Sequence, residues 1–415
     1  MAEIALTDLL GMPVVDASGV QRGRVRELAM VPHNDTLRVA SLIVRTKTGD
    51  RMLPFASLIA INGVVQVNST EASWPPSGES EGEGLFLLER DLLDQQIIDV
   101  HGRKVVRVND VDLYREKNQG HVSLKVASVD VGPRGAIRRL LKGVVPMAVL
   151  RRLLQQIPER PIPWEFVDLI ETDPARRVKL KISHERLAKL HPADIADIVE
   201  ELAPDEREAV FETLDEEVAA ETLEEMDPRV QKSVVESLDS DRAAEIVEEM
   251  NPDAAADLLG DLGEEQTSQI LQEMEPADRK EISDLLEFGE NTAAGRMNTE
   301  FVALGINGTM RDAIEALRTY EGGVETLSTV YIVDSQGTLV GAVPLAKLVL
   351  ADPTTPLLAL VQEPLISAPE DAKDQDVAEL FDKYNLLILP VVDEHKRLTG
   401  VITSDDVITL LRAKL

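Results

Sequence analysis

The chain has 415 residues, no cysteine, and 43 Lys and Arg against 75 Asp and Glu, which gives a formal net charge of −32 at pH 7. The lack of cysteine excludes disulfides, thiolate metal sites and a cysteine nucleophile, so a reducing, cytoplasmic location is expected. The N-terminal residues lack the pattern of a signal peptide, and the best apolar runs, 143–150 and 385–392, fall far short of the about 20 residues that a membrane span requires.

Two similar segments lie in the N-terminal part of the chain. The pattern DLL, VVD, G, RV and E at residues 8–27 returns as DLL, IID, G, RV and D at residues 91–110. Apolar and polar residues alternate in both, and turn signals divide them into short strands. We therefore expect two copies of one small β domain, at 1–68 and 85–157. Residues 69–84 between them are rich in Pro, Gly, Ser and Glu and are expected to be an unpacked linker.

The second copy ends in a predicted helix, residues 136–156, whose apolar stripe is opposed by a basic face that includes Arg138 and Arg139. That face suits anionic lipid, nucleic acid or an intramolecular dock on the acidic half of the chain. The dock is favoured because it needs no outside partner. Residues 158–183, which begin with several prolines, are expected to be a second linker.

Residues 191–286 consist of eight consecutive units of equal length, the first at 191–202 and the last at 275–286. Each unit ends in Leu or Met, and five have Pro in second place, which is typical of the first residue of a helix. A helix this short is unstable alone, so the units must stack, and we expect an all-α superhelical solenoid over 184–290. The units carry 31 Asp and Glu against 6 Lys and Arg, so their compact form needs cations to offset its self-repulsion.

A second duplication occupies the C-terminal part. The sequence VD followed by LVG at 333–341 returns as VD followed by LTG at 392–400. Helices are expected at 310–320 and 375–384, each followed by a strand, a turn, a second strand and a closing helix. This predicts two small α/β units, at 291–353 and 354–415. In the second unit Gly400, Thr403 and Asp406 have the spacing Gly-x-x-Thr-x-x-Asp.

That spacing and the repeated β-β-α pattern resemble tandem CBS domains. The resemblance implies a cleft for ATP or another adenosine nucleotide, with Gly400, Thr403 and Asp406 as the binding residues. The Thr403 hydroxyl would meet a phosphate, and the Asp406 carboxylate would accept ribose hydroxyls. The alternative for Asp406 is to cap the helix that follows it. The resemblance also implies a homodimer formed through the CBS pair.

The solenoid and its exit are similar to the cytosolic region of the MgtE magnesium channel family, through the motifs LHPADIADIVEEL at 190–202, MNPDAAADLL at 250–259 and ENTAAGRMNTEF at 290–301. In that family the acidic solenoid packs over the CBS pair and Mg²⁺ bridges them. The family's membrane domain would begin soon after Asp406, whereas this chain ends at Leu415. Transport is therefore not expected of this chain.

The resemblance implies Mg²⁺ ligands on both sides of such a bridge. Asp253 and Asp257, at positions i and i+4 on one helical face, are expected on the solenoid, and Asp405 or Asp406 is expected on the CBS side. Asp194 and Asp197 form a secondary pair. The alternative for each of these carboxylates is an ordinary solvated surface acid.

The two N-terminal repeats resemble PRC-barrel domains, on residues such as Gly11, Asp16, Gly19 and Glu27 of the first copy. The resulting fold class is multidomain α+β: two small PRC-type β-barrels, an all-α superhelical solenoid and a tandem α/β CBS pair. PRC barrels mediate contacts with proteins or ribosomes, so the resemblance implies a protein partner whose identity the sequence does not reveal.

Two functions compete. No enzyme motif is found, and the six histidines are scattered, so the chain is not expected to be an enzyme. The leading hypothesis is a regulatory protein that binds Mg²⁺ between the solenoid and the CBS pair, with an adenine nucleotide as a second ligand. The alternative is an adaptor that binds protein or ribonucleoprotein through the barrels, with the solenoid as a spacer. Direct DNA contact is not expected of so acidic a chain, and any membrane association would be peripheral.

Overall fold

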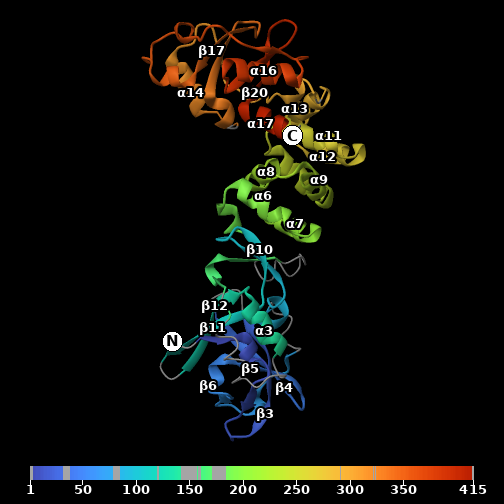
Figure 1. The fold of residues 1–415 in the computed structure, drawn as a ribbon, viewed down its shortest axis with the longest axis vertical. Helices are drawn as coiled ribbons and strands as arrows, with labels where there is room; N and C mark the ends of the chain where they lie inside the picture. The colour runs from blue at the N-terminus through green and yellow to red at the C-terminus, as the bar shows by residue number, and fades with distance from the viewer. Residues whose placement is uncertain are drawn as a thin grey trace. The chain divides into compact units, whose positions relative to one another are not determined.

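The computed structural model describes residues 3–30, 38–77, 85–118, 121–141, 157, 160–170, 184–289, 291–320, 322 and 324–413. The chain divides into two compact units. The first comprises residues 1–218 and 225–227, and the second comprises residues 219–224 and 228–415. In Figure 1 the first unit runs from blue to green and the second from green to red.

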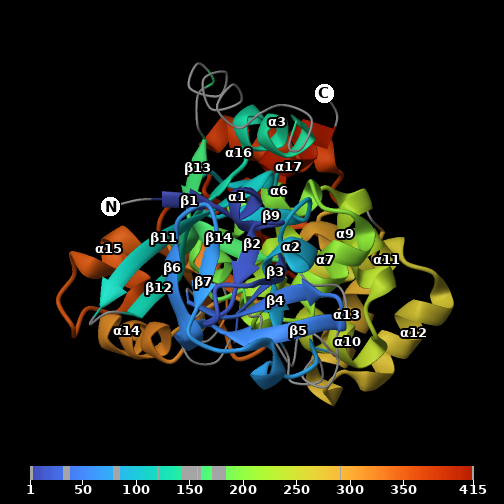
Figure 2. The same cartoon turned by 90° about the horizontal axis from the view of Figure 1, so that it is seen from below.

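The first β copy has strands β1 (Glu3–Ala5), β2 (Pro13–Val15), β3 (Gln21–Met30), β4 (Val39–Thr46), β5 (Gly49–Pro54), β6 (Leu58–Ile61) and β7 (Val65–Val67), helix α1 (Leu6–Leu9) and the 3-10 turns η1 (Phe55–Ser57) and η2 (Glu71–Ser73). Its sheet has the order β5-β4-β3-β2-β7-β6, and Figure 2 shows β3, β4 and β5 side by side.

The second copy has strands β8 (Phe86–Leu87), β9 (Gln96–Asp99), β10 (Lys104–Arg107), β11 (Asp110–Asn118), β12 (His121–Asp130), β13 (Pro161–Pro163) and β14 (Val167–Leu169), helices α2 (Leu88–Asp91) and α3 (Pro133–Leu141), and the 3-10 turn η5 (Trp164–Phe166). They form two sheets, β1-β11-β12-β13 and β10-β9-β14. The pairings among the described strands leave the sheets open, so the closed barrels expected from the sequence stay a prediction.

The two copies exchange their first strands. Strand β1 of the first copy pairs with β11 of the second, and β8 of the second copy pairs with β3 of the first. A single apolar cluster contains buried residues from both copies, for example Leu28 and Leu113. The repeats therefore share one core, and each copy completes the other.

A buried acid at the same place in each copy supports this exchange. Glu27 accepts hydrogen bonds from two backbone N–H groups at the start of α2, and Asp110 accepts from the backbone and hydroxyl of Thr7 in α1. Of these two acids, only Asp110 is paired with a cation among the described residues: Arg138 of α3 donates a hydrogen bond to its carboxylate at 2.8 Å. Burial raises the pKa of Glu27 to about 7. It also raises the pKa of Asp110, an effect that Thr7 and Arg138 oppose.

Both predicted linkers are wrong in part. Residues 69–77 pack on the first copy: the Trp74 side chain is buried, and its indole N–H donates a hydrogen bond to the Ser69 hydroxyl. Residues 78–84 lie outside the described residues. Residues 161–169 form β13, η5 and β14, which pair with β12 and β9. They repeat the β5-η1-β6 segment of the first copy, so the second β copy extends to residue 169. Pro161 begins strand β13 and Pro163 ends it, so these prolines bound a strand and do not mark a loop.

The basic helix, predicted at 136–156, is confirmed over residues 136–141 as part of α3, which begins three residues earlier, at Pro133. Residues 142–156 lie outside the described residues. Its arginines bind within the same compact unit. Arg138 pairs with Asp110, and Arg139 pairs with Asp94. The intramolecular dock is therefore present for these two side chains, although the acids it uses belong to the β domain and not to the solenoid.

The eight predicted helices of the repeat array are confirmed. They are α6 (Pro192–Glu200), α7 (Pro204–Phe211), α8 (Glu216–Glu224), α9 (Pro228–Ser237), α10 (Ser240–Glu248), α11 (Pro252–Asp261), α12 (Glu264–Glu273) and α13 (Pro276–Leu286). Within the second unit α11 packs on α9 and α13, and α10 packs on α12. From α9 to α13 each helix thus stacks on the one after next, so in this stretch a pair of consecutive sequence units makes one structural repeat.

The C-terminal pair has the expected order. The first copy has β15 (Ala303–Gly305), α14 (Met310–Arg318), β16 (Thr329–Val333), β17 (Leu339–Pro344) and α15 (Leu345–Val349); the second has β18 (Ala368–Pro369), α16 (Asp374–Tyr384), β19 (Ile388–Val392), β20 (Leu398–Thr403) and α17 (Ser404–Ala413) (Figure 1). In both, the first strand runs parallel to the second and the third antiparallel to it. Within the described residues no helix is long and apolar enough to cross a membrane.

Candidate metal centre between the helical domain and the CBS pair

The start of α11 connects the repeat array to the C-terminal pair. Glu224, at the end of α8, accepts hydrogen bonds from the backbone N–H and the side-chain amide of Asn251 at 2.6 and 2.8 Å. The amide of Asn298 donates to the Asn251 side-chain oxygen at 3.2 Å. The backbone of Asn298 in turn exchanges two hydrogen bonds with Val401 of β20. This chain of contacts holds α11 beside the strand that leads into α17.

Two predicted site residues face each other across this contact. Asp253 lies in the first turn of α11 and Asp406 in the first turn of α17. Burial raises the pKa of Asp253 well above its usual value, and the negative charge of Asp406 raises it further. Burial also raises the pKa of Asp406 to about 6, against the hydrogen bonds that it accepts from Thr403.

The donor set fits a hard divalent cation. The Oδ1 atom of Asp253 is enclosed and has no hydrogen-bond partner among the described residues, a costly state for a carboxylate oxygen. A shared cation would remove the repulsion between the two carboxylates. Mg²⁺ takes one or two protein carboxylates and keeps several waters. In the described part of the chain no group of three or more His, Asp or Glu side chains is arranged to hold a metal.

Asp257 lies near this pair but already has a counter-ion. Its charge contributes to the raised pKa of Asp253, so the two residues share a face of α11 as their spacing predicts. Arg296 pairs with the Asp257 carboxylate at 2.8 Å, and its charge favours ionised Asp406. Arg296 is therefore a built-in cation at the edge of the carboxylate group, and sequence reasoning did not identify it.

The remaining predicted metal ligands lie elsewhere. Asp405 is exposed on α17, and its negative charge helps to raise the pKa of Asp406. Asp194 of α6 pairs with Arg103 of the β domain at 2.7 Å, in the first compact unit. Asp197 is exposed on the same helix. Asp194 and Asp197 belong to the first compact unit and Asp253 to the second, so a metal role for Asp194 and Asp197 stays a prediction.

Gly400, Thr403 and Asp406 form a tight strand-to-helix turn. The Thr403 backbone and hydroxyl both donate to Asp406 Oδ2, at 2.7 and 2.6 Å. Helix α17 already begins at Ser404, so Asp406 stabilises the helix start from within the first turn and does not precede the helix as the expected alternative had it. A Cβ on Gly400 would lie 2.7 Å from the Met297 side chain. Gly400 is thus needed for packing against the segment that joins the two domains, and nucleotide binding by the three residues stays a prediction.

Glu224 is a functional neighbour that sequence reasoning missed, although the repeat carries its signal. Three hydrogen bonds each join a glutamate to a backbone N–H at the start of a later helix, always at the same separation along the chain. The glutamates are Glu200, Glu224 and Glu248, each two sequence units from the next. A glutamate recurring in the last turn of alternate helices predicts such N-terminal caps, and Glu224 is the one that caps the helix bearing Asp253.

Fold and site together define a helical repeat domain joined to a CBS pair, with paired carboxylates at their contact. Residues 190–291 match the MgtE intracellular N domain, and residues 358–413 match the CBS domain. The chain is 35% identical over 136 residues to the magnesium transporter MgtE of Thermus thermophilus. The matched segment is 33% of this chain and 30% of that protein. The chain is likewise 35% identical over 131 residues to MgtE of Enterococcus faecalis, covering 32% and 29%.

Two solved structures extend this similarity. One is the soluble part of a magnesium transporter, with a TM-score of 0.53 and 28% identity, which covers 56% of this chain and 91% of that one. The other is the cytosolic domain of the Mg²⁺ channel MgtE in complex with ATP, with a TM-score of 0.52 and 31% identity, covering 56% and 94%. The chain resembles the cytosolic part of MgtE, and its match spans 30% and 29% of the length of these two curated relatives.

Proposed function

We propose that this chain is a regulatory protein that senses Mg²⁺ by binding it between Asp253 of α11 and Asp406 of α17. The carrying observation is the half-buried carboxylate pair at the contact of the helical domain with the CBS pair, where the charge of Asp406 acts on Asp253. A bound Mg²⁺ would supply the positive charge that lets both carboxylates stay ionised. Because the matched residues lie in the helical and CBS domains, the proposed role is regulation and not transport.

The mechanism follows from charge and packing. Without the cation, closing the contact brings two negative charges together in a site with little water, which favours separation. With a cation bound, Asp253 and Asp406 would hold α11 against α17, while Glu224 and Asn251 keep the start of α11 in place. Magnesium shifts the population toward the closed contact only by its higher affinity for it.

Limited proteolysis with and without millimolar Mg²⁺, with Ca²⁺ as a control, tests the proposal at the 291–299 segment. Protection by Mg²⁺ is expected in the native chain and is expected to disappear in D253N. The matched control is D241N, because Asp241 has the same place in its repeat unit but is exposed. D257N should keep most of the protection, since Asp257 is already paired with Arg296.

Titration calorimetry with Mg²⁺ measures the same site directly. D253N is expected to weaken binding about tenfold or more, the equivalent of one charge-assisted contact. Cleavage that is unchanged by Mg²⁺ in the native chain, or protection that survives in D253N, would refute the proposal. Unchanged cleavage in the native chain would favour the adaptor function.

ATP or another adenine nucleotide is proposed as a second ligand of the CBS pair near Thr403, and repeating the titration with ATP present tests it. Support comes from the similarity to the ATP-bound MgtE cytosolic domain. A homodimer through the CBS pair is also proposed, because Val349, Leu350 and Ile408 are exposed apolar side chains there. Light scattering that finds a monomer at micromolar concentration would contradict the dimer.

The β repeats are proposed to be PRC-type domains that contact a protein partner. Their duplicated sequence and shared core support an interaction module more than a catalytic domain.

A further inference from the structure

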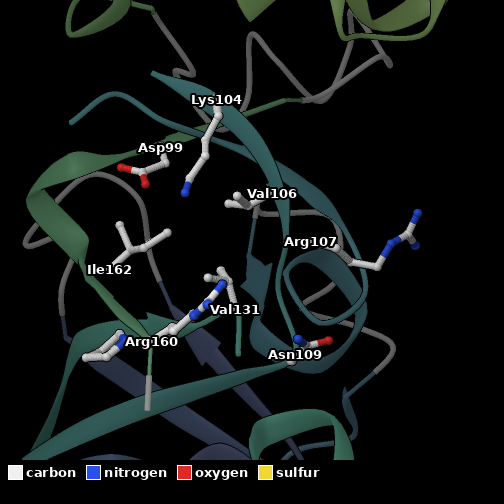
Figure 3. Close-up of a pocket in the computed structure, with 9 residues that line it drawn as sticks. Asp99, Lys104, Val106, Arg107, Asn109, Val131, Arg160 and Ile162 are labelled. Atoms are coloured by element: carbon white, nitrogen blue, oxygen red, sulfur yellow. The ribbon is translucent and has the colours of Figure 1, made fainter. Parts of the chain in front are cut away.

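The second β copy contains a cavity of about 470 Å³ whose walls are strands β9, β10 and β13 and the end of β12 (Figure 3). The apolar side chains of Val106, Val131 and Ile162 line it, and Lys104 and Arg160 extend into it. Arg107 also belongs to the lining but points away from the cavity in Figure 3, where its guanidinium donates to a backbone carbonyl.

Comparison of the two β copies explains why the space exists. In the first copy the β4–β5 hairpin covers the start of β3, with Gly23 opposite Thr46 and Thr46 opposite Gly49. In the second copy β12 ends at Asp130 and the chain continues into α3, which replaces the corresponding hairpin tip. Strand β10 pairs only with β9 among the described strands. Strand β10, which corresponds to the start of β3, lines the cavity instead of being covered by a hairpin.

The charges in the cavity are unlike those of the chain as a whole. Two cations, Lys104 and Arg160, extend into it beside one carboxylate, Asp99, in a protein with a net charge of −32. Neither Lys104 nor Arg160 makes a side-chain ion pair or hydrogen bond within the described residues. Two such cations beside the apolar side chains of Val106, Val131 and Ile162 are suited to bind an anion that also has an apolar part.

Asp99 differs from its counterpart in the first copy in a way that frees one oxygen. Asp16 accepts hydrogen bonds from Ser18, Val20 and the guanidinium of Arg22. The residue that corresponds to Arg22 is Val105, and from the described residues Asp99 accepts only the Gly102 backbone N–H, through Oδ1. Its other oxygen is available to accept a hydrogen bond from a ligand hydroxyl or amine.

We propose that this cavity binds a small organic phosphate. Arg160 and Lys104 hold the phosphate, and Val106, Val131 and Ile162 cover its apolar part. Asp99 accepts a hydrogen bond from a hydroxyl or amine on the same molecule and repels anions that offer none. Sugar phosphates and nucleoside monophosphates share this chemistry. The site lies in the first compact unit and is independent of the Mg²⁺ site proposed above.

Calorimetric titration of the full chain with phenyl phosphate, inorganic phosphate and phenol tests the two halves of the cavity. Phenyl phosphate is expected to bind about tenfold more tightly than inorganic phosphate, because only it uses the apolar floor. Phenol should not bind at concentrations up to about 10 mM. Equal affinity for phenyl phosphate and inorganic phosphate, or no binding of phenyl phosphate, would overturn the proposal.

Variants with opposite expected effects separate binding from misfolding. R160Q and K104Q should each weaken phenyl phosphate binding about tenfold, whereas D99N should strengthen it by removing a repelling charge and still accept from Gly102. The matched control is R51Q, because Arg51 is the counterpart of Arg160 in the copy where the hairpin is present. Affinity unchanged by R160Q and K104Q together would refute the site.

To distinguish the two ligand sources, glucose 6-phosphate and AMP are each titrated into the native chain, into R160Q and into D99N. The ligand whose affinity falls in R160Q and also falls in D99N is assigned to the cavity, because its own donor group then contacts Asp99. If R160Q changes the affinity for neither compound, both bind elsewhere and the proposal fails.

Discussion

The buried Glu27 carboxylate should make the β region less stable as the pH rises. Glu27 is 6% exposed, and no cation pairs with it among the described residues. Burial raises its pKa from 4.5 to about 7. The folded protein therefore holds more protons than the unfolded chain between these values, and the free energy of unfolding falls as pH increases through that window. The full shift corresponds to about 3 kcal/mol.

Replacing Glu27 with Gln removes this titration. Near pH 5 the native side chain is mostly protonated, so E27Q should cost about 1 kcal/mol, because the Gln amide does not accept the bond that one Glu27 oxygen takes from the Arg90 backbone. At pH 8 the variant avoids a buried charge and should be about 2 kcal/mol more stable than the native chain. The difference between the two proteins therefore changes sign between these pH values.

Tryptophan fluorescence during urea unfolding isolates this region, because both tryptophans of the chain, Trp74 and Trp164, are buried in it. At pH 8 the E27Q midpoint should rise by about 1 M urea. The control is E165Q, which removes an exposed charge in the same region and should leave the pH dependence unaltered. Parallel stability curves for E27Q and the native chain from pH 5 to 8 would show that the argument is wrong.

Two further substitutions probe the contact of the helical domain with the CBS pair. R296Q removes the cation beside Asp257 and should raise the affinity for Mg²⁺ about three- to tenfold, because the metal no longer competes with a fixed charge; calorimetry that finds weaker binding would contradict this. G400A places a Cβ 2.7 Å from Met297 and should lower stability by about 2 kcal/mol in thermal unfolding, whereas G305A, with open space around its Cβ, should be neutral and serves as its control.

Residues in the repeat array show how much a sequence predicts when each structural element is local. Leu or Met at the end of every unit and Pro at helix starts predicted all eight helices, because capping and the apolar stripe act within one unit. The pairing of Glu224 with Asn251 was not predicted, since it joins helices three units apart. Asp253 and Asp257 look alike in sequence, yet only one has Arg296 as its partner.

The β region shows the opposite case. Alternation of apolar and polar residues predicted strands and the duplication predicted two copies, but the exchange of β1 and β8 depends on which strand edge each meets in space. Proline-rich residues 161–163 form a strand because the edge of β12 is available to pair with them. The composition of that segment is otherwise typical of a loop.

The amino-acid sequence alone determined the negative charge, the repeat period, the order of the domains and the residues able to offer carboxylates, because these follow from composition and short-range spacing. Only the tertiary structure decided which carboxylates lose their water and meet. Asp253 faces Asp406, while Asp194 finds Arg103 instead. The physical reason is that desolvation and charge pairing depend on distances between segments far apart in the chain, which local patterns do not specify.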